Sequence, residues 1–347
     1  MKIAIATVQI PFIKGGAEYL ASNLLKELTE RGYEADIITM PFKWYPASSI
    51  MDSILSARMI DLTEVNGVKI DKLIALKFPM YYVQHEHKVT WMLHQHRQAY
   101  ELWGTEYGDL DKMEDGPRVR DIIVKNDCKF LAESKGLYTI SNTVTDRLKK
   151  YNGLNSIPLY HPPSNHKEFY CDNFEDYIFY PGRITEIKRQ HILIESLKYC
   201  SENIKVVLAG SIDESYRPKV QSIIKENGLE NRVIFAGFIT EEEKRRYYSN
   251  ALAIYNGPYQ EDYGYVTLEA FFALKPVLTH YDSGGPLEFV KNEHTGYITD
   301  DHPEKLAEKI DLLYNNKNKA RELGLNGNRL LEDLKVDWNY VIERLIT

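Results

Sequence analysis

Residues 252–274, LAIYNGPYQEDYGYVTLEAFFAL, carry the strongest fold signal in this chain. The first five residues form a short apolar run that is typical of a buried strand, and residues 265–274 predict a helix. The loop between them contains Glu261 and Gly264, and Glu269 follows on the helix. The order strand, loop, helix is the repeating unit of a parallel sheet that is covered by helices.

Glu269 is the only charged residue between Val266 and Leu274. A buried carboxylate without a partner costs several kcal/mol, so we expect Glu269 to be hydrogen-bonded or paired. The start of the same helix offers N–H groups and the positive end of the helix dipole to an anion such as a phosphate. A phosphate at the helix start and hydroxyls on the two carboxylates would together suit a sugar nucleotide.

Length and composition indicate an ordinary globular chain of two domains, because 347 residues exceed what a single core usually supports. A net charge of −7 argues against a nucleic-acid-binding surface. The three cysteines, Cys128, Cys171 and Cys200, lack metal-ligand spacing, which favours a reducing, cytoplasmic compartment. The sequence shows neither a signal peptide nor an apolar run of the roughly 18 residues that a membrane span needs.

Strand and helix patterns alternate through both halves of the chain. In the first half, we expect strands at residues 2–10, 34–40, 73–78, 88–93 and 136–140, with helices at 17–31 and 119–134. In the second half, we expect strands at 177–180, 204–209, 233–236, 252–256 and 276–280, with helices at 188–200, 216–227 and 241–249. A proline-rich segment, residues 158–166, separates the halves and is typical of a linker. The pattern predicts two similar α/β domains, with ligands at the carboxyl ends of the strands and in the cleft between the domains.

Two further segments at expected strand ends could bind anions. Gly15 and Gly16 follow the first strand and open a helix, where glycine allows close backbone approach, although a plain tight turn would explain them equally well. Arg183 and Lys188 follow the first strand of the second half. Their guanidinium and ammonium groups suit phosphate oxygens, whereas the alternative is a pair of solvated surface cations.

Several histidines and acids raise the question of a metal site. His94 and His96 lie in a turn after a strand, with His85 and His87 upstream. Imidazole clusters favour zinc, but no cysteine or nearby acid completes a ligand set, so a metal is the weaker interpretation. The segment Asp109-Leu110-Asp111 lies in a polar loop, where we interpret the acids as solvated.

These segments together resemble the retaining nucleotide-sugar glycosyltransferases of family 4, the glycosyl transferases group 1. That family has the GT-B fold, an α/β fold of two Rossmann-like domains that face each other across a cleft. The resemblance covers nearly the whole chain and is best between Phe179 and Gly296. It rests on Gly-Arg-x4-Lys at residues 182–188 and on Glu-x7-Glu at 261–269. The chain departs from the family at Leu274, where a glycine is common before Lys-Pro, which blurs the subclass.

The resemblance implies a role for each motif residue. Glu261 and His94 would be catalytic, Glu269 would bind the ribose, and no metal or other cofactor would be needed. The donor phosphates would lie against Gly16, Arg183, Lys188, Gly264, Tyr265 and Val266. The sugar would lie beside Glu261, Asp262 and Tyr263, and the base beside Phe238 and Ile239. Thr240 and Glu243 also fit a helix capping box, which would explain part of that last segment structurally.

The resemblance also implies a domain plan. Residues 1–165 would be an acceptor-binding domain, residues 166–330 a nucleotide-sugar-binding domain, and residues 331–347 a C-terminal helix that packs back on the first domain. The expected reaction is transfer of a sugar from a UDP- or GDP-sugar to a hydroxyl of a saccharide or lipid-linked acceptor. The expected location is the cytoplasm, and peripheral contact with the cytoplasmic face of a membrane is compatible with it.

Three alternatives compete with this expectation. A sugar-nucleotide epimerase or another sugar-nucleotide-processing enzyme would share the fold. A nicotinamide-dependent dehydrogenase is disfavoured because Gly-x-Gly-x-x-Gly spacing is missing. A non-enzymatic sugar-binding protein would not need Arg183, Lys188, Glu261 and Glu269 together.

Overall fold

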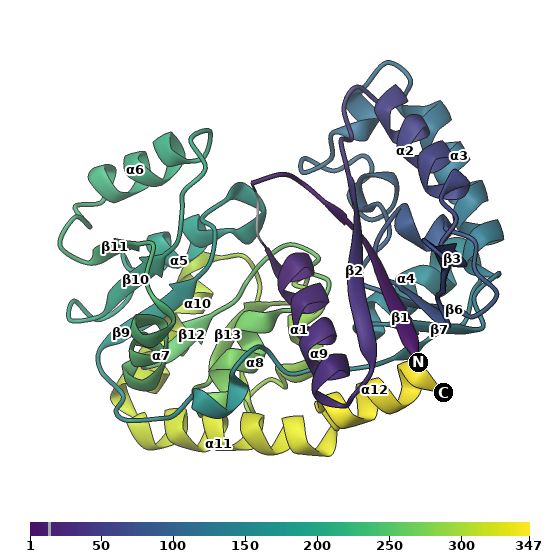
Figure 1. The fold of residues 1–347 in the computed structure, drawn as a ribbon. Helices are drawn as coiled ribbons and strands as arrows, with labels where there is room; N and C mark the ends of the chain where they lie inside the picture. The colour runs from purple at the N-terminus through teal and green to yellow at the C-terminus, as the bar shows by residue number, and fades with distance from the viewer. Residues whose placement is uncertain (13–14) are drawn as a thin grey trace. The chain divides into compact units, whose positions relative to one another are not determined.

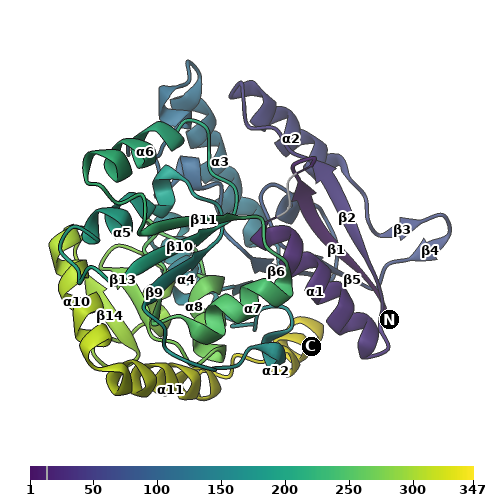
Figure 2. The ribbon, with the colours of Figure 1, turned by 90° about the vertical axis from the view of Figure 1, so that its left-hand side faces the viewer.

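The computed structural model describes residues 1–12 and 15–347, which form two compact units (Figures 1 and 2). The first unit comprises residues 1–164 and 337–347, and the second comprises residues 165–336. Each unit has a six-stranded sheet whose neighbouring strands are all parallel. This arrangement confirms the expected α/β class with two Rossmann-like halves.

The first unit is built on a sheet with the strand order β2-β1-β5-β6-β7-β8. Residues in the middle of β1 are buried, as in a strand covered on both faces, and its sequence is correspondingly apolar. The strands are β1 (Lys2–Gln9), β2 (Glu34–Pro41), β5 (Lys72–Ala75), β6 (Lys88–Met92), β7 (Gly136–Thr139) and β8 (Ile157–Pro158). A separate two-stranded antiparallel ribbon consists of β3 (Glu64–Val65) and β4 (Val68–Lys69).

Five α-helices belong to the described part of the first unit. They are α1 (Gly16–Glu30), α2 (Ser48–Met59), α3 (Gly116–Leu131), α4 (Asn142–Asn152) and the C-terminal α12 (Trp338–Ile346). Helix α12 packs against α1, and the ring of Trp338 lies 6.0 Å from that of Trp91 on β6. The buried Lys72 ammonium donates to the backbone carbonyls of Leu345 and Ile346, which ties the end of the chain to the start of β5.

The second unit has the strand order β11-β10-β9-β12-β13-β14. Its strands are β9 (Tyr177–Pro181), β10 (Lys205–Ala209), β11 (Val233–Gly237), β12 (Ala253–Tyr255), β13 (Val277–His280) and β14 (Gly296–Thr299). Its helices are α5 (Gln190–Ser196), α6 (Arg217–Glu226), α7 (Glu241–Asn250), α8 (Tyr265–Phe272), α9 (Pro286–Phe289), α10 (Pro303–Asn315) and α11 (Lys317–Asp333). Helices α5, α6 and α10 pack together, whereas α8 contacts α9, α11 and the strands β12 and β13.

Strand order creates a switch point near the middle of each sheet. Successive connections run in one direction from β9 through β10 to β11, and in the other direction from β12 through β13 to β14. The same reversal separates β1 from β5 in the first unit. In open parallel sheets, ligands bind outside the carboxyl ends of the strands at such a point. The fold therefore directs attention to the loops that follow β9 and β12.

The helix predicted at residues 188–200 is wrong at its beginning. A 3-10 turn, η5 (Glu186–Lys188), ends in Arg189, which has φ 55°, and α5 begins only at Gln190. A left-handed residue cannot continue a right-handed helix. Strand β14 and helices α2, α4, α10 and α11 were not predicted from the sequence. No helix in the described ranges is both long and apolar enough to cross a membrane.

Candidate functional site

Lys188 and Glu261 form an ion pair at the switch point of the second sheet. Lys188 lies in the loop after β9 and Glu261 in the loop after β12, and these two strands are neighbours. About a quarter of each side chain is exposed, 23% for Lys188 and 24% for Glu261, so both groups are reachable from solvent. The structure thus brings together a predicted phosphate-binding cation and a predicted sugar-binding acid.

The loop after β9 is held by the buried side chain of Gln190. Its Nε2 donates to the carbonyl of Arg183 at 3.0 Å, and its Oε1 accepts the N–H of Thr185 at 3.3 Å. Gly182 has φ 134°, which a residue with a side chain rarely adopts. The side chain of Arg183 is exposed and makes no ion pair in the part of the chain that the structure describes. Its guanidinium is therefore available to an anion.

The backbone of Glu261 is fixed by the loop that follows β13. Its N–H donates to the carbonyl of Ser283 at 2.8 Å, and its carbonyl accepts the N–H of Gly285 at 2.8 Å. Gly284 lies directly opposite Glu261, and any side chain at Gly284 would collide with the Glu261 backbone. The backbone position of Glu261 is therefore set by the loop that follows β13.

Gly264 forms the turn that starts α8. Its φ is 92°, and its carbonyl accepts the N–H of Thr267 at 2.9 Å. Tyr265 and Val266 are the first two residues of the helix. The first N–H groups of an α-helix have no acceptor within the helix, and its dipole is positive there. The left-handed turn at Gly264 therefore favours glycine, and it leaves these N–H groups at the start of α8.

Glu269 has a hydrogen-bonding partner and a positively charged partner, as expected for a carboxylate on an apolar helix. Its Oε2 accepts a hydrogen bond from the Tyr248 hydroxyl at 2.7 Å, and its Oε1 contacts the Lys244 ammonium at 3.1 Å. Burial alone would lower the pKa of Lys244, but Glu269 and Glu241 raise it above its usual value. This confirms the prediction that Glu269 is paired. Because each carboxylate oxygen can accept more than one hydrogen bond, Glu269 can still take hydroxyl groups.

Phe238 and Ile239 follow β11 at the edge of the second sheet. The Phe238 side chain is 88% exposed and contributes nothing to the core. Thr240 caps α7 by accepting the N–H of Glu243 at 3.2 Å, while the Glu243 carboxylate accepts the N–H of Thr240 at 2.8 Å. The capping box is confirmed. It fixes the turn, and it leaves the Phe238 ring open to a planar ligand.

Asp262 and Tyr263 continue the loop between Glu261 and the glycine turn. Tyr263 is buried, with its ring 5.3 Å from that of Tyr265 and 5.7 Å from that of Phe289. Gly285 packs against the Tyr263 backbone, where an added Cβ would lie 2.6 Å from its carbonyl oxygen. The loop is consequently anchored on both sides of Asp262, which is itself partly exposed.

Gly16 and His94 lie at the carboxyl edge of the sheet in the first unit. Gly16 is the first residue of α1, and the preceding Gly15 N–H donates to the Glu18 carboxylate at 2.8 Å. His94 follows β6 and is partly buried. Its Nδ1 lies 2.5 Å from the carbonyl oxygen of Gln95, which can only accept, so Nδ1 donates this hydrogen bond.

The four neighbouring histidines have different surroundings. His96 is buried against Phe42 and Phe78, and burial lowers the pKa of His96 to about 3. The ring of His85 lies 6.2 Å from that of His87, and its Nε2 contacts the Ile70 carbonyl. Among residues 1–12 and 15–347, no three His, Cys, Asp or Glu side chains are grouped to hold a metal ion.

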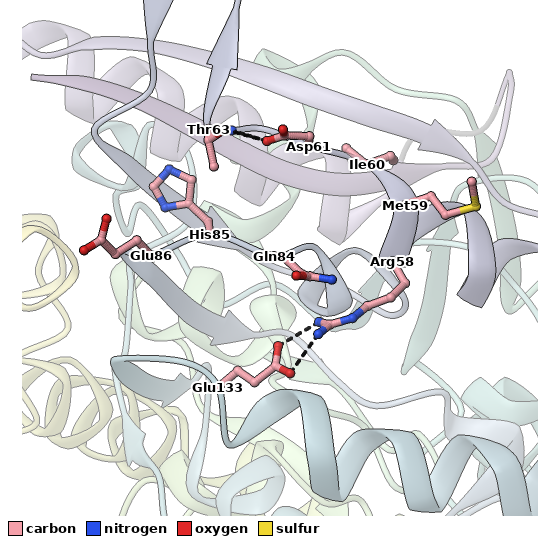
Figure 3. A pocket seen from close by; sticks show the side chains of 9 residues that line it. All are labelled: Arg58, Met59, Ile60, Asp61, Thr63, Gln84, His85, Glu86 and Glu133. Atoms are coloured by element: carbon pink, nitrogen blue, oxygen red, sulfur yellow. Dashed lines mark hydrogen bonds and ion pairs between the residues drawn. The ribbon is translucent and has the colours of Figure 1, made fainter.

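A pocket of about 560 Å³ lies elsewhere in the first unit (Figure 3). Gln84, His85 and Glu86 in its wall immediately precede β6, so the pocket lies at the amino edge of the sheet. Arg58 spans it as a bidentate ion pair with Glu133, at 2.7 and 2.9 Å (Figure 3). None of the predicted site residues lines this pocket.

Four residues that the sequence did not single out support the site. Lys244 and Tyr248 hold Glu269, and Arg189 and Asp282 join the loops around Glu261. Lys244 and Tyr248 lie one turn apart on α7, a spacing that places two side chains on one helix face. For Arg189, the only sequence signal was its position directly after Lys188, which is weaker evidence than a shared helix face.

The architecture consists of two Rossmann-like halves, each with a switch point in its parallel sheet. Solved structures share this fold. A crystal structure of HepE from Anabaena in complex with UDP-glucose superposes with a TM-score of 0.73 at 16% identity, covering 100% of this chain and 98% of that one. The fold is therefore that of the GT-B glycosyltransferases.

A family match covers most of the second unit. Residues 165–330 match the family Glycosyl transferases group 1. An uncharacterized glycosyltransferase of Methanocaldococcus jannaschii is 26% identical over 350 residues, which covers 90% of this chain and 88% of the relative. Alpha-1,3/1,6-mannosyltransferase ALG2 of Dictyostelium discoideum is 33% identical over 138 residues. That match covers 38% of this chain and spans about a third of the mannosyltransferase, 33% of its length.

Leu274 is where the chain departs from the glycine that is common in the family. The structure gives Leu274 a φ of 54°, in the left-handed region that glycine adopts without strain. A conformation that suits glycine is thus adopted here by a leucine, in the turn after α8.

Proposed function

We propose that this protein is a retaining glycosyltransferase that moves a sugar from a nucleoside diphosphate donor, a UDP- or GDP-sugar, to a hydroxyl of a saccharide or lipid-linked acceptor. The observation that carries the proposal is the contact between Lys188 and Glu261 at the switch point, beside the start of α8. A phosphate-binding cation and a hydroxyl-binding acid in contact match a ligand in which a sugar is linked directly to a diphosphate.

Stabilisation of the leaving diphosphate is the main catalytic contribution in this scheme. Arg183, Lys188 and the N–H groups at the start of α8 supply fixed positive charge where negative charge develops, which is usually the largest single effect in catalysis. When the diphosphate enters, it replaces Glu261 as the partner of Lys188. Glu261 is then released to the hydroxyls of the sugar.

The other predicted residues grip the rest of the donor. Glu269 accepts hydrogen bonds from the ribose hydroxyls, while Tyr248 and Lys244 hold its carboxylate in place. Phe238 and Ile239 contact the base, Asp262 and Tyr263 line the sugar, and Gly16 approaches the diphosphate. His94 is assigned to the sugar, where it supports the positive charge that develops on the sugar ring.

Charge neutralisation by side chains and a helix start makes the reaction independent of a metal ion in this proposal. Retention is assigned to attack by the acceptor on the face that the diphosphate leaves. The first unit is assigned the acceptor, and exposed rings such as Tyr45 offer surfaces on which a sugar can stack. The protein acts in the cytoplasm, where nucleotide sugars are the available donors, with peripheral contact to the membrane when the acceptor is lipid-linked.

A transfer assay tests the proposal. The protein is incubated with UDP- and GDP-sugars, each with and without pooled saccharide and lipid-linked acceptors, and nucleoside diphosphate release is measured. We expect release with one donor to rise when the acceptor is present, and NMR of the product to show the anomeric configuration of the donor. An inverted product would refute retention, and absence of release with every donor would refute the transferase assignment.

A further inference from the structure

Arg189 has a backbone conformation that its residue type disfavours. Its φ is 55° and its ψ is 36°, in the left-handed region where a side chain with a Cβ is strained. Such strain persists only where the surrounding contacts impose it, and it concentrates at functional sites. The side chain of Arg189 is also nearly fully buried, at 5% exposure for the residue. Both facts call for an explanation beyond a surface turn.

The guanidinium of Arg189 connects three loops at the carboxyl edge of the second sheet. Its own backbone ends η5, directly after Lys188. Its Nε and Nη2 donate to the carbonyls of Gly257 and Pro258, each at 2.9 Å, in the loop that leads to Glu261. Nη1 and Nη2 also grip the two carboxylate oxygens of Asp282, after β13, at 2.9 and 2.6 Å.

Backbone hydrogen bonds continue the same connections toward the ion pair. Tyr259 N–H donates to the carbonyl of Ile187 at 2.8 Å, and Gln260 N–H donates to the carbonyl of Asp282 at 2.9 Å. The Tyr255 hydroxyl donates to the carbonyl of Arg189 at 3.1 Å, which fixes its backbone from the sheet side. Arg189 therefore contacts both loops that meet at the ion pair without being one of its members.

We propose that Arg189 and Asp282 are positioning residues that set the spacing between Lys188 and Glu261. The inference rests on the proposed function, because that spacing matters only if the two residues share one ligand. The planar guanidinium of an arginine offers enough N–H donors to bind two carbonyls and a carboxylate together, whereas the compact ammonium of a lysine does not match this geometry. Arg189 adopts the strained left-handed conformation because this guanidinium is needed directly after Lys188.

The test compares Arg189→Gly, Arg189→Lys and Asp282→Asn with the wild type. Arg189→Gly relieves the backbone strain and keeps the turn, but it removes the guanidinium. Arg189→Lys keeps the positive charge but loses the planar arrangement of donors. Arg217→Ala is the matched control, because it breaks the exposed bidentate pair between Arg217, the first residue of α6, and Glu214, which precedes the helix. Each variant is assayed for kcat and donor KM well below its Tm.

We expect Arg189→Gly and Arg189→Lys to lower kcat/KM roughly 100-fold, the loss typical of a displacement of about 1 Å in a site. Asp282→Asn should lose less, because the carbonyl contacts of Arg189 remain. Arg217→Ala should match the wild type. If Arg189→Lys keeps wild-type kinetics, or Arg189→Gly lowers only the Tm, the positioning role is overturned.

Amide hydrogen exchange gives a readout that does not depend on activity. In Arg189→Gly, the amides of Tyr259, Gln260 and Glu261 should exchange faster than in the wild type, whereas amides of α6 should not change. Unchanged exchange at these three amides would contradict the positioning role of Arg189, even if the enzyme is active. Conversely, faster exchange in Arg189→Gly, found together with a wild-type protein that transfers no sugar, would refute the proposed function and leave the positioning role of Arg189 standing.

Discussion

Replacing Glu261 by glutamine separates binding of the sugar from binding of the diphosphate. The substitution keeps the size and shape of the side chain and removes its charge. In the absence of ligand, Glu261 pairs with Lys188, so a diphosphate must displace it. The glutamine variant has no such competition, although it also loses the acid that accepts hydrogen bonds from the sugar.

The structure sets the expected magnitudes. A pair with about a quarter of each side chain exposed is worth up to about 1 kcal/mol, so Glu261→Gln should bind free UDP or GDP equally well or up to about fivefold more tightly. Hydrogen bonds to a charged group contribute about 1.5–3 kcal/mol, so kcat/KM for the sugar donor should fall roughly 10- to 150-fold. Affinity and turnover should thus change in opposite directions.

Calorimetry with free nucleoside diphosphates and a diphosphate-release assay measure the two effects. Glu168→Gln serves as the control, because it removes the acid of an exposed ion pair with Arg245 at 2.9 Å. That variant should match the wild type in both measurements. Equal weakening of diphosphate binding and turnover in Glu261→Gln would refute the reasoning, since it would assign Glu261 to the structure of the loop rather than to the sugar.

Three further outcomes are expected. Glu269→Gln should weaken nucleoside diphosphate binding about tenfold and abolish any preference for ribose over 2′-deoxyribose; a retained preference in calorimetry would argue against the ribose contact. Burial raises the pKa of Asp127 to about 6 from its usual 3.8 despite hydrogen bonds from Tyr100, Tyr82 and Tyr81. The folded state therefore holds this proton more tightly, and its contribution to stability, about 3 kcal/mol, is present below about pH 4 and lost as the pH rises through 6. Denaturant unfolding should show this loss in the wild type and not in Asp127→Asn, and parallel pH profiles would contradict it. Turnover should survive EDTA; its abolition, with rescue by a divalent ion, would overturn metal independence.

The sequence predicted the strand ends near which the candidate residues lie better than it predicted the contacts between those residues. Arg183, Lys188 and Glu261 lie in loops that follow β9 and β12, because motif and strand end could be read together. The pairing of Lys188 with Glu261 could not be predicted, since it depends on β9 and β12 being neighbours. Strand order is set by long-range packing, which a local pattern does not contain.

The partners of Glu269 and the backbone strain at Arg189 also depend on contacts between distant parts of the chain. An isolated carboxylate on an apolar helix indicated that Glu269 needs partners, but Lys244 and Tyr248 come from a different helix. The helix expected at residues 188–200 included Arg189, and arginine is a residue that favours helices. Contacts with Asp282 and two carbonyls override that preference and force the left-handed conformation.

Titration of UDP and GDP into the wild type and into the double variant Arg183→Ala/Lys188→Ala tests whether these two cations at the switch point bind a nucleoside diphosphate. We expect one of the two nucleotides to bind the wild type, and the double variant to bind it at least about 100-fold more weakly, given about 1.5 kcal/mol or more for each charged contact. Equal affinity in the two proteins, or no binding of either nucleotide to the wild type, would show that Arg183 and Lys188 do not form a diphosphate site.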